Sequence, residues 1–342
     1  MIIEEFESPP KEWNKFVKNH PEHKLYHLAE WSKVVSQTFG HKNTYLIARQ
    51  QGEICGVLPI TRFSSLLFGK FAVSLPFINY GGALLNERVS IAPFFNYLAN
   101  FREKHQLSFV ELRNDSPLDT YFPCKTHKVT FFMELPDNPD VLMKSFKAKL
   151  RSQIKRPTKE GMFAKKGGRE LLDDFYRVFS INMKELGTPV LPKKFFRNIF
   201  THFSASSFIV VVYTPDHKPV AASFLLKYRE IMEIPWASSI RAFNRFSPNM
   251  LLYWSSFEVA MENECSIFDF GRCTPNSGTY RFKKQWGAKE SQLYWYYVLP
   301  ENEVLPELNP SNPKFELLIK IWQKLPVLIT NTVGPHIIKN IP

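Results

Sequence analysis

Residues 268–288, with the sequence FDFGRCTPNSGTYRFKKQWGA, bring several chemically useful side chains into one short stretch. Asp269 can accept a proton, and Arg272 can bind a carboxylate or phosphate through two parallel hydrogen bonds. Lys283 carries a positive charge that can stabilise an oxyanion or a phosphate-bearing leaving group. Two alternatives stay open: Asp269 and Arg272 also suit a structural ion pair, and Lys284 either binds the substrate or is a solvated neighbour of Lys283.

Hydroxyl and amide side chains separate Arg272 from Lys283. Asn276, Thr279 and Tyr280 can hydrogen-bond a sugar or a peptide, although the same residue types also form ordinary polar turns. The alternation of Phe268, Asp269 and Phe270 predicts a strand before them. We therefore expect a motif loop at 268–288 that carries acceptor-binding groups and a lysine to the end of a strand.

A basic segment at 144–166 holds nine Lys or Arg residues and one Glu. Met143, Phe146, Leu150 and Ile154 have helical spacing, which predicts one helix that Pro157 stops. The helix is either a solvated basic face or an element that contacts backbone phosphates. The candidates for phosphate contact are Lys147, Arg151, Lys155 and Arg156.

The elements that must position these groups occur twice. The first copy comprises a hairpin at 45–63, a loop at 79–82, a helix from about 89 and a strand at 109–113. The second comprises strands at 208–213, 220–228 and 231–237, a helix that Ser247 and Pro248 begin, and the strand at 267–270. The pattern predicts an α/β fold of two similar units with mixed sheets and flanking helices. We expect boundaries at 1–140 and 141–300, followed by an amphipathic tail at 301–342.

Two further segments allow two interpretations each. Tyr80 and Gly81, in the loop Asn79–Gly82, either line a cleft, because glycine permits close approach of a ligand, or form a tight turn. The apolar residues from Phe315 to Ile338 either pack on the body of the protein or lie on an acidic membrane surface.

Composition limits the classes of partner and location. The 342 residues are 44% hydrophobic, and 44 Lys and Arg against 32 Asp and Glu give a net charge of +12. This charge favours an anionic partner such as nucleic acid, a phosphorylated small molecule or an acidic membrane. The four cysteines and the isolated His27, His41 and His217 lack the spacing of a metal site, so we expect no metal. The acidic N-terminus has no apolar signal region, so we expect a cytoplasmic protein.

A resemblance makes the expectation more specific. The order of hairpin, helix and strand resembles the GNAT acyltransferase superfamily, although Arg241–Pro248 lacks the glycine-rich loop usual there for acetyl-CoA. The paired units, the basic segment and the motif Phe282-Lys283-Lys284-Gln285-Trp286-Gly287 resemble the FemAB family. The stretches SLPFINYGG (74–82), LRSQIKR (150–156), ELGTPVLPKKFF (185–196) and SPNMLLYW (247–254) are similar to FemAB-related proteins associated with exosortase/PEP-CTERM exopolysaccharide loci.

The resemblance implies a function and its residues. FemAB enzymes transfer an aminoacyl group from aminoacyl-tRNA to an amine of a peptidoglycan precursor, and the family pattern ties the lysine at Lys283 to catalysis. It implies an acyltransferase that forms an amide on a cell-envelope glycan or on a peptidoglycan or exopolysaccharide precursor. No cofactor is held, and the donor is aminoacyl-tRNA or acyl-CoA. Two alternatives stay open: an acyl-CoA-dependent N- or O-acyltransferase, and a non-catalytic scaffold of polysaccharide export. A lipid-linked acceptor implies contact of the tail with the inner face of the plasma membrane.

Overall fold

The computed structural model describes residues 1–65, 69–87, 89–301, 303–305 and 313–341. They divide into two compact units, each with a mixed sheet and flanking helices. The first unit contains Met1–Val129, Gln292–Leu308 and Asn340–Pro342, and the second contains Thr130–Ser291 and Asn309–Lys339. This arrangement confirms the predicted α/β fold with two mixed sheets.

The first sheet follows the order β1-β2-β3-β4-β6-β15-β7, with β5 paired to β3. Its strands are β1 (Ile2–Phe6), β2 (Lys42–Gln50), β3 (Glu53–Ser65), β4 (Gly69–Val73), β5 (Leu84–Leu85), β6 (Val110–Asn114), β7 (Cys124–Lys125) and β15 (Tyr294–Val298). Its helices are α1 (Trp13–Asn19), η1 (Leu25–His27), α2 (Ala29–Phe39) and α3 (Ala92–Lys104). The predicted hairpin at 45–63 is present as β2 and β3, which pair antiparallel.

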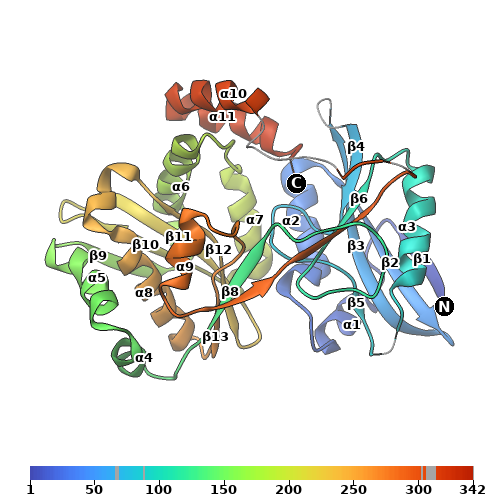
Figure 1. Cartoon of the computed structure of the whole chain (residues 1–342), viewed down its shortest axis with the longest axis horizontal. Helices are drawn as coiled ribbons and strands as arrows, with labels where there is room; N and C mark the ends of the chain where they lie inside the picture. Colours follow the sequence, from blue (N-terminus) through green and yellow to red (C-terminus); the bar gives the residue numbers. More distant parts are fainter. Residues whose placement is uncertain (66–68, 88, 302, 306–312, 342) are drawn as a thin grey trace. The chain divides into compact units, whose positions relative to one another are not determined.

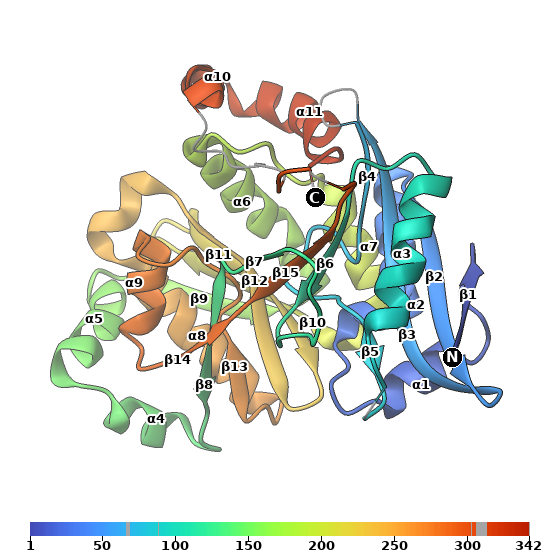
Figure 2. The ribbon, with the colours of Figure 1, turned by 45° about the vertical axis from the view of Figure 1, so that its right-hand side comes forward.

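Alternation along β2 explains why helices cover both faces of the first sheet. Leu46 packs in a buried cluster with residues of α3, whereas Tyr45 packs in another with Trp13 of α1. Because successive strand residues point to opposite faces, one strand contributes side chains to two hydrophobic cores. Figure 2 shows α3 on one side of β2 and β3 and the helices α1 and α2 on the other.

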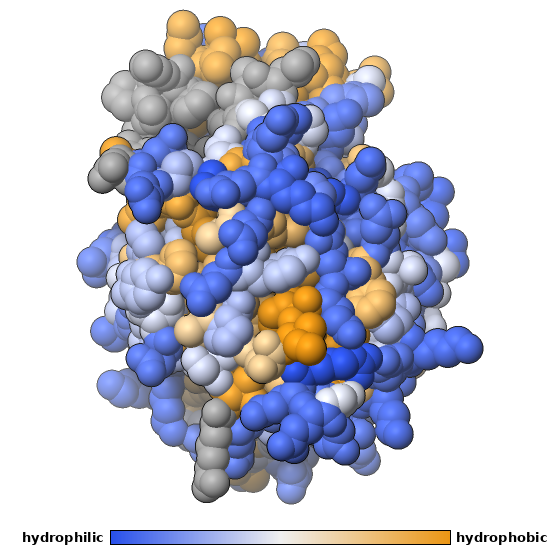
Figure 3. All heavy atoms as spheres, turned by 90° about the vertical axis from the view of Figure 1, so that its right-hand side faces the viewer, coloured by the Kyte–Doolittle hydropathy of each residue, from blue (hydrophilic) through white to orange (hydrophobic). Residues whose placement is uncertain are grey.

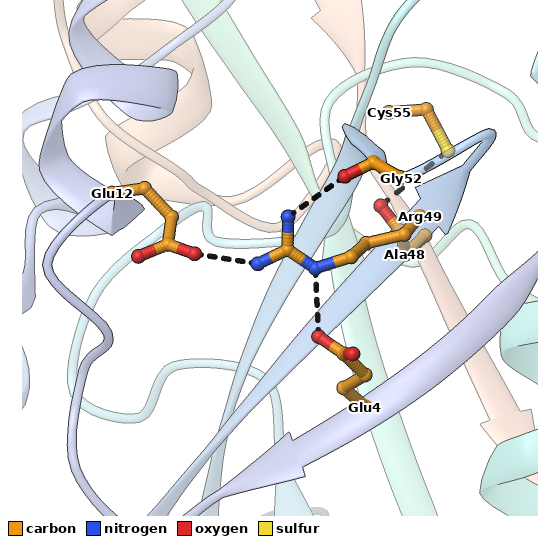
Figure 4. A network of polar contacts seen from close by, with 6 residues as sticks. All are labelled: Glu4, Glu12, Ala48, Arg49, Gly52 and Cys55. Atoms are coloured by element: carbon orange, nitrogen blue, oxygen red, sulfur yellow. Dashed lines mark hydrogen bonds and ion pairs between the residues drawn. The ribbon is translucent and has the colours of Figure 1, made fainter.

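One arginine on β2 forms hydrogen bonds that hold the edge strand β1 in place. Arg49 on β2 donates from Nε to Glu4 on β1 at 2.8 Å and from another nitrogen to Glu12, just before α1, at 2.5 Å. It also donates to the carbonyl of Gly52 in the β2–β3 turn at 3.2 Å (Figure 4). One planar guanidinium therefore joins a strand, a turn and the start of a helix.

The second sheet follows the order β14-β8-β13-β12-β11-β10-β9. Its strands are β8 (Val129–Glu134), β9 (Phe163–Gly167), β10 (Ser207–Tyr213), β11 (Pro219–Tyr228), β12 (Ile231–Ser239), β13 (Ile267–Asp269) and β14 (Lys289–Gln292). Its helices are α4 (Pro139–Ser145), α5 (Ala148–Lys159), η2 (Arg169–Leu171), α6 (Leu172–Leu186), α7 (Lys193–Phe203), η3 (Ser204–Ser206), η4 (Arg241–Phe246), α8 (Pro248–Glu262), α9 (Gly278–Lys284), α10 (Pro313–Lys324) and α11 (Val327–Ile338).

Neighbouring residues of β11 again contact helices on opposite faces of the sheet. Phe224 packs its ring against Phe175 of α6 and Phe196 of α7. Ser223 lies 3.1 Å from Ser256 of α8 through their hydroxyl oxygens. The helix α8 is buried along most of its length, and it forms the core of the second unit on that face.

Two strands lie on the other side of the sequence-based boundaries at 140 and 300. β8 lies before residue 140 but pairs with β13 of the second sheet, and β15 lies before residue 300 but pairs with β6 of the first. In Figure 1, orange-red β15 lies among the strands of the first sheet. The boundaries differ because pairing partners far apart in the chain leave no local sequence signal.

Two local predictions are corrected. The apolar stripe from Met143 to Ile154 does not form one helix, because Phe146 and Lys147 are extended and separate α4 from α5. Pro157 does not stop α5, which continues to Lys159. The helix closes beyond the proline because the amides of Glu160 and Met162 bond to the carbonyls of Arg156 and Pro157.

Ser247 stands at the predicted N-cap position of α8 but does not cap the helix with its side chain. Its φ of 60° lies in the left-handed region, whereas capping residues are normally extended. The predicted helix near residue 89 begins at Ala92, and its residues Phe94, Leu98 and Phe101 are buried as the spacing indicated.

Candidate active site in the second unit

The parallel strands β12 and β13 meet over a short length and then separate. They pair from Ile231 and Ile267 to Glu233 and Asp269, where β13 ends. β12 continues to Ser239, whose hydroxyl accepts a 3.0 Å hydrogen bond from Asn249 in the first turn of α8. The end of the pairing therefore lies where a sheet opens beside the start of a helix.

Two carboxyl groups occupy the last paired position. Glu233 and Asp269 are opposite each other in the register, and both are fully buried. Asp269 accepts hydrogen bonds of 2.8 Å from the hydroxyl of Thr130 on β8 and from the amide of Gly271. Hydrogen bonds of this kind stabilise a carboxylate that water cannot reach.

The segment predicted as a loop at 268–288 contains a helix. Ser277 caps α9 by accepting a 3.1 Å hydrogen bond from the amide of Tyr280. Phe282 packs edge-on against Tyr253 of α8 at 4.8 Å between ring centres, and Trp286 packs against Phe257 at 5.0 Å. The capped start and the aromatic contacts explain why this polar stretch is helical and held on α8.

These contacts place Lys283 inside the protein. Its exposed fraction is 5%, and its Nζ donates to the carbonyl oxygens of Gly271 at 2.6 Å and Arg272 at 3.0 Å. Burial lowers the pKa of Lys283 from 10.5 to about 8, while Cys273, Asp269 and Glu233 act in the opposite direction. A lysine with such a pKa is positive at neutral pH and can still release a proton in mildly alkaline solution.

This arrangement suits the stabilisation of negative charge or the transfer of a proton. An ammonium group has three donors, and the carbonyls of Gly271 and Arg272 take two of those on Lys283. Ionisable groups with perturbed pKa values near the end of strands are candidates for catalysis. The cluster of Lys283, Asp269 and Glu233 is therefore our candidate active site.

The remaining motif residues lie around α9 and not in one pocket. Asn276 and Thr279 are exposed, and Arg272 is half-buried. Tyr280 donates its hydroxyl to Glu290 at 2.6 Å, and this bond raises the pKa of Tyr280. Lys284 is exposed, with its Nζ 5.6 Å from the centre of the Tyr280 ring.

The two residues of the basic segment predicted to contact phosphate, Arg151 and Lys155, differ in their surroundings. Arg151 donates a 2.6 Å hydrogen bond to the carbonyl of Phe146, so it holds the break between α4 and α5. Lys155 is exposed on α5.

The predicted cleft residues of the first unit are buried. Tyr80 is 1% exposed, and Gly81 has a φ of 151° with the Leu75 side chain 2.6 Å from where a Cβ would stand. Lys24, which pairs with Asp115 at 2.6 Å, lies over the Tyr80 ring. Tyr80 and Gly81 also line a small cavity of about 20 Å³ together with Lys24, so the cleft and the tight turn both stay open as interpretations of this loop.

A second buried network lies in the first unit and was not predicted from the sequence. Arg113 donates from Nε to Glu111 at 2.7 Å, and Tyr297 donates its hydroxyl to the other oxygen of Glu111 at 2.7 Å. Burial and the Glu111 carboxylate raise the pKa of Tyr297 well above its ordinary value. Charged residues alternating with apolar ones in VELRN were the only local signal for this network.

Glu233 and Cys273 were also missed in the second unit. Cys273 is 6% exposed, and its thiol influences the pKa of Lys283. Glu233 is a single acidic residue within the apolar strand IMEIPW. An isolated acid inside a buried strand is a signal of this kind of site, although it does not identify its partner.

Comparison with known families agrees with the geometry of the second unit. Residues 144–284 match a family model described as an acetyltransferase (GNAT) domain. This stretch is therefore similar to GNAT domains. It includes β12, β13, α8 and the candidate active site. A comparison of the sequence with curated proteins gave no match.

Solved structures show that the tandem fold is shared. FemX has 15% identity and a TM-score of 0.65, with 86% of this chain and 97% of that chain covered. L-PGS from Bacillus licheniformis has 14% identity and a TM-score of 0.55, with 93% and 98% covered. A tandem GNAT protein from the clavulanic acid biosynthesis pathway has 10% identity and a TM-score of 0.54, with 88% and 100% covered. The prediction of two tandem GNAT-like units is confirmed.

The described part of the chain holds neither a membrane-spanning helix nor a metal-binding cluster. No helix in that part of the chain is long and apolar enough to cross a bilayer. No group of three or more His, Cys, Asp or Glu side chains there is arranged to hold a metal ion.

Proposed function

We propose that this protein is an acyltransferase of the FemAB type. It transfers an aminoacyl or acyl group to an amine of a cell-envelope glycan or of a peptidoglycan or exopolysaccharide precursor, and an amide forms. The observation that carries the proposal is Lys283, buried where β12 and β13 separate and bonded to the carbonyls of Gly271 and Arg272. The similarity in fold to FemX supports the proposal.

The chemistry assigns a role to each group. Attack of a neutral amine on the acyl carbon forms a tetrahedral oxyanion, and Lys283 supplies the positive charge that stabilises it. The amide forms when the bond from the acyl carbon to the donor's oxygen or sulfur breaks, and the proton that the amine loses leaves with the released hydroxyl or thiol group. Asp269, held by Thr130 and Gly271, keeps a negative charge near Lys283 and opposes the loss of its proton. Arg272 carries a second positive charge into the same segment and binds a carboxylate or phosphate of the substrate.

Aminoacyl-tRNA is the donor that we favour over acyl-CoA. The segment before α8 forms η4 without a glycine, and Ser247 alone takes the left-handed conformation there. The net charge of +12 agrees with a nucleic-acid donor. Binding of an acyl-CoA thioester is the alternative, because the matched family model describes an acetyltransferase.

The tail is proposed to hold the protein against the inner face of the plasma membrane, near a lipid-linked acceptor. In α11, Thr330 and Gly334 are buried, whereas Leu328, Ile329 and Val333 are exposed. Leu317, Leu318 and Ile321 are likewise exposed on α10. Figure 3 shows hydrophobic residues at the top, over these helices. Exposed apolar residues with nearby lysines suit the surface of an acidic bilayer.

One experiment separates the donor classes. Binding of charged tRNA, uncharged tRNA and coenzyme A is measured on the purified protein across a salt series, and charged tRNA is expected to bind best. Amide formation from charged tRNA is expected to fall by about 10²–10³-fold in Lys283→Ala, as for loss of an oxyanion donor. Lys194→Ala, an exposed lysine on α7, is the matched control.

The other outcomes contradict the proposal. Equal binding of charged and uncharged tRNA excludes recognition of the aminoacyl group. Saturable coenzyme A binding without tRNA preference moves the protein to the acyl-CoA class. Absence of binding to any donor supports a non-catalytic scaffold.

A further inference from the structure

A cavity of about 860 Å³ lies in the second unit, beside the basic segment. It is lined by the end of β8, by α4 and the start of α5, and by the residues that follow α9. Its volume falls within the range of about 300–1,000 Å³ that is usual for ligand sites. Lys283 is not part of its lining, so the cavity is separate from the candidate active site.

The walls of the cavity are mainly apolar. They include Met133, Leu142, Phe146, Leu150, Ile267 and Trp286. Most of these side chains are buried, and Ile267 is half-buried. Such a wall favours an aliphatic chain, because each methylene removed from water contributes about 0.8 kcal/mol.

The mouth of the cavity is positively charged. Lys147, Lys149, Lys284 and Lys289 line it together with one carboxylate, Glu134. Glu134 is paired with Lys289 at 2.7 Å. Lys147 and Lys149 are exposed and form no ion pair with any residue that the structure describes. Two cations at the mouth therefore lack a negative partner within the described part of the protein.

The start of α5 adds to this positive potential. Lys147 is the extended N-cap residue of this 12-residue helix and makes no side-chain cap, and no acidic residue occurs in the first turn. The amides at a helix start and the helix dipole favour an anion, whereas lysines at that end are unfavourable. Lys147 and Lys149, at this helix start, line the cavity, and Arg151 holds the break that precedes the helix.

We propose that this cavity binds an amphiphile with a phosphate head group and an apolar chain. The phosphate lies at Lys147, Lys149 and the start of α5, and the chain lies on the wall formed by Leu142, Phe146 and Trp286. A phosphate fits better than a carboxylate because its larger charge and three oxygens match two lysines and a helix start together. The site is independent of the proposed transfer reaction, since no residue of the candidate active site lines it.

Calorimetric titration with small monomeric probes tests the proposal. Octyl phosphate is expected to bind the full-length protein at one site at least about tenfold more tightly than octanoate or inorganic phosphate. Geranyl phosphate, a branched isoprenoid, is compared with octyl phosphate. A preference for either one supports the site and identifies the class of chain.

Three variants locate the binding. The double variant Lys147→Ser with Lys149→Ser is expected to bind octyl phosphate about tenfold or more weakly than the wild type. The control, Lys159→Ser with Lys194→Ser, removes the same charge from exposed positions outside the cavity and is expected to change nothing. Ser145→Trp places a large side chain at the lining and is expected to abolish octyl phosphate binding. Unchanged melting temperatures show that each variant is folded, and the exposed lysine variants do not disturb the core.

Three results overturn the proposal. Octyl phosphate that binds no more tightly than inorganic phosphate rules out use of the apolar wall. An equal loss in the control pair assigns binding to general charge attraction. Undiminished binding in folded Ser145→Trp places the probe outside the cavity.

Discussion

Thr130 donates a 2.8 Å hydrogen bond to Asp269, a residue 139 positions later in the chain. The first unit contains the same relationship, because Tyr297 on β15 donates to Glu111. In both units the buried acid lies at the end of a parallel strand pair, and the adjacent antiparallel strand, β8 or β15, supplies the hydroxyl. In each unit, a strand from beyond the predicted boundary thus helps to hold the buried carboxyl group.

Loss of the Thr130 hydroxyl is expected to destabilise the second unit. Thr130→Val keeps the shape of the side chain and removes one donor to buried Asp269, which costs about 1–3 kcal/mol. The free energy of unfolding from urea titrations measures the change. Thr126→Val, an exposed residue on the same segment, is the control and is expected to have little effect. An equal loss in both variants would show that the hydrogen bond is not the cause.

The stability of the protein is expected to depend on pH through Lys283. The pKa of this lysine is about 8 in the folded protein and 10.5 without burial. Between these values the folded state has lost a proton that the unfolded state keeps, so stability rises with pH. Relative to Lys283→Met, the free energy of unfolding of the wild type is therefore expected to increase from pH 7.5 to pH 10. A constant difference between the two proteins would contradict a lowered pKa.

Arg113 and Glu111 are expected to depend on each other. Arg113→Met leaves a buried carboxylate without its cation, which costs about 3–5 kcal/mol. The double variant Glu111→Gln with Arg113→Met removes that charge and is expected to recover part of the loss. Denaturant unfolding of the two single variants and the double variant measures the coupling. Additive effects would show that the 2.7 Å ion pair contributes little.

Gly82 is expected to tolerate no larger side chain. An added Cβ at Gly82 would stand 2.4 Å from the Asn114 side chain, whereas Gly278 has open space. Gly82→Ala is expected to lower stability by about 1–3 kcal/mol through overpacking, and Gly278→Ala is the tolerated control. Thermal unfolding compares the two. A melting temperature for Gly82→Ala equal to the wild type would mean that the loop moves aside at no cost.

Membrane binding is expected to depend on the tail. Leu317→Ser with Leu318→Ser removes exposed apolar side chains of α10 and is expected to reduce cosedimentation with vesicles that contain anionic lipid. Ile2→Ser, an exposed residue of β1, is the control with no expected effect. A wild-type protein that stays in the supernatant at low salt would contradict the proposed membrane contact.

The sequence was sufficient for elements whose signals are local. Alternation identified the hairpin of β2 and β3, and the helical spacing of Met250, Trp254 and Phe257 identified α8. The motif at Phe282 and Lys283 drew attention to the segment of the second unit that contains the buried Lys283. These signals succeed because period and turn chemistry act within a few residues.

Other features depended on distant residues and were not predictable. Nothing near Phe146 shows that Arg151 binds its carbonyl and that the basic segment bends there. The short helix α9 depends on the cap by Ser277 and on contacts of Phe282 and Trp286 with α8. The helix α8 precedes α9 in the chain, and the strand β13 lies between them. The burial of Lys283 follows from those contacts, and its position in the motif does not reveal it.

The late position of β15 in the chain also sets the order in which the chain can fold during synthesis. β6 pairs with β15, so the first sheet is incomplete until residues 294–298 have left the ribosome. Until then β6 presents an open edge on one side, and open strand edges promote aggregation. The N-terminal unit, although it begins the chain, is therefore completed only after most of the second unit has been made.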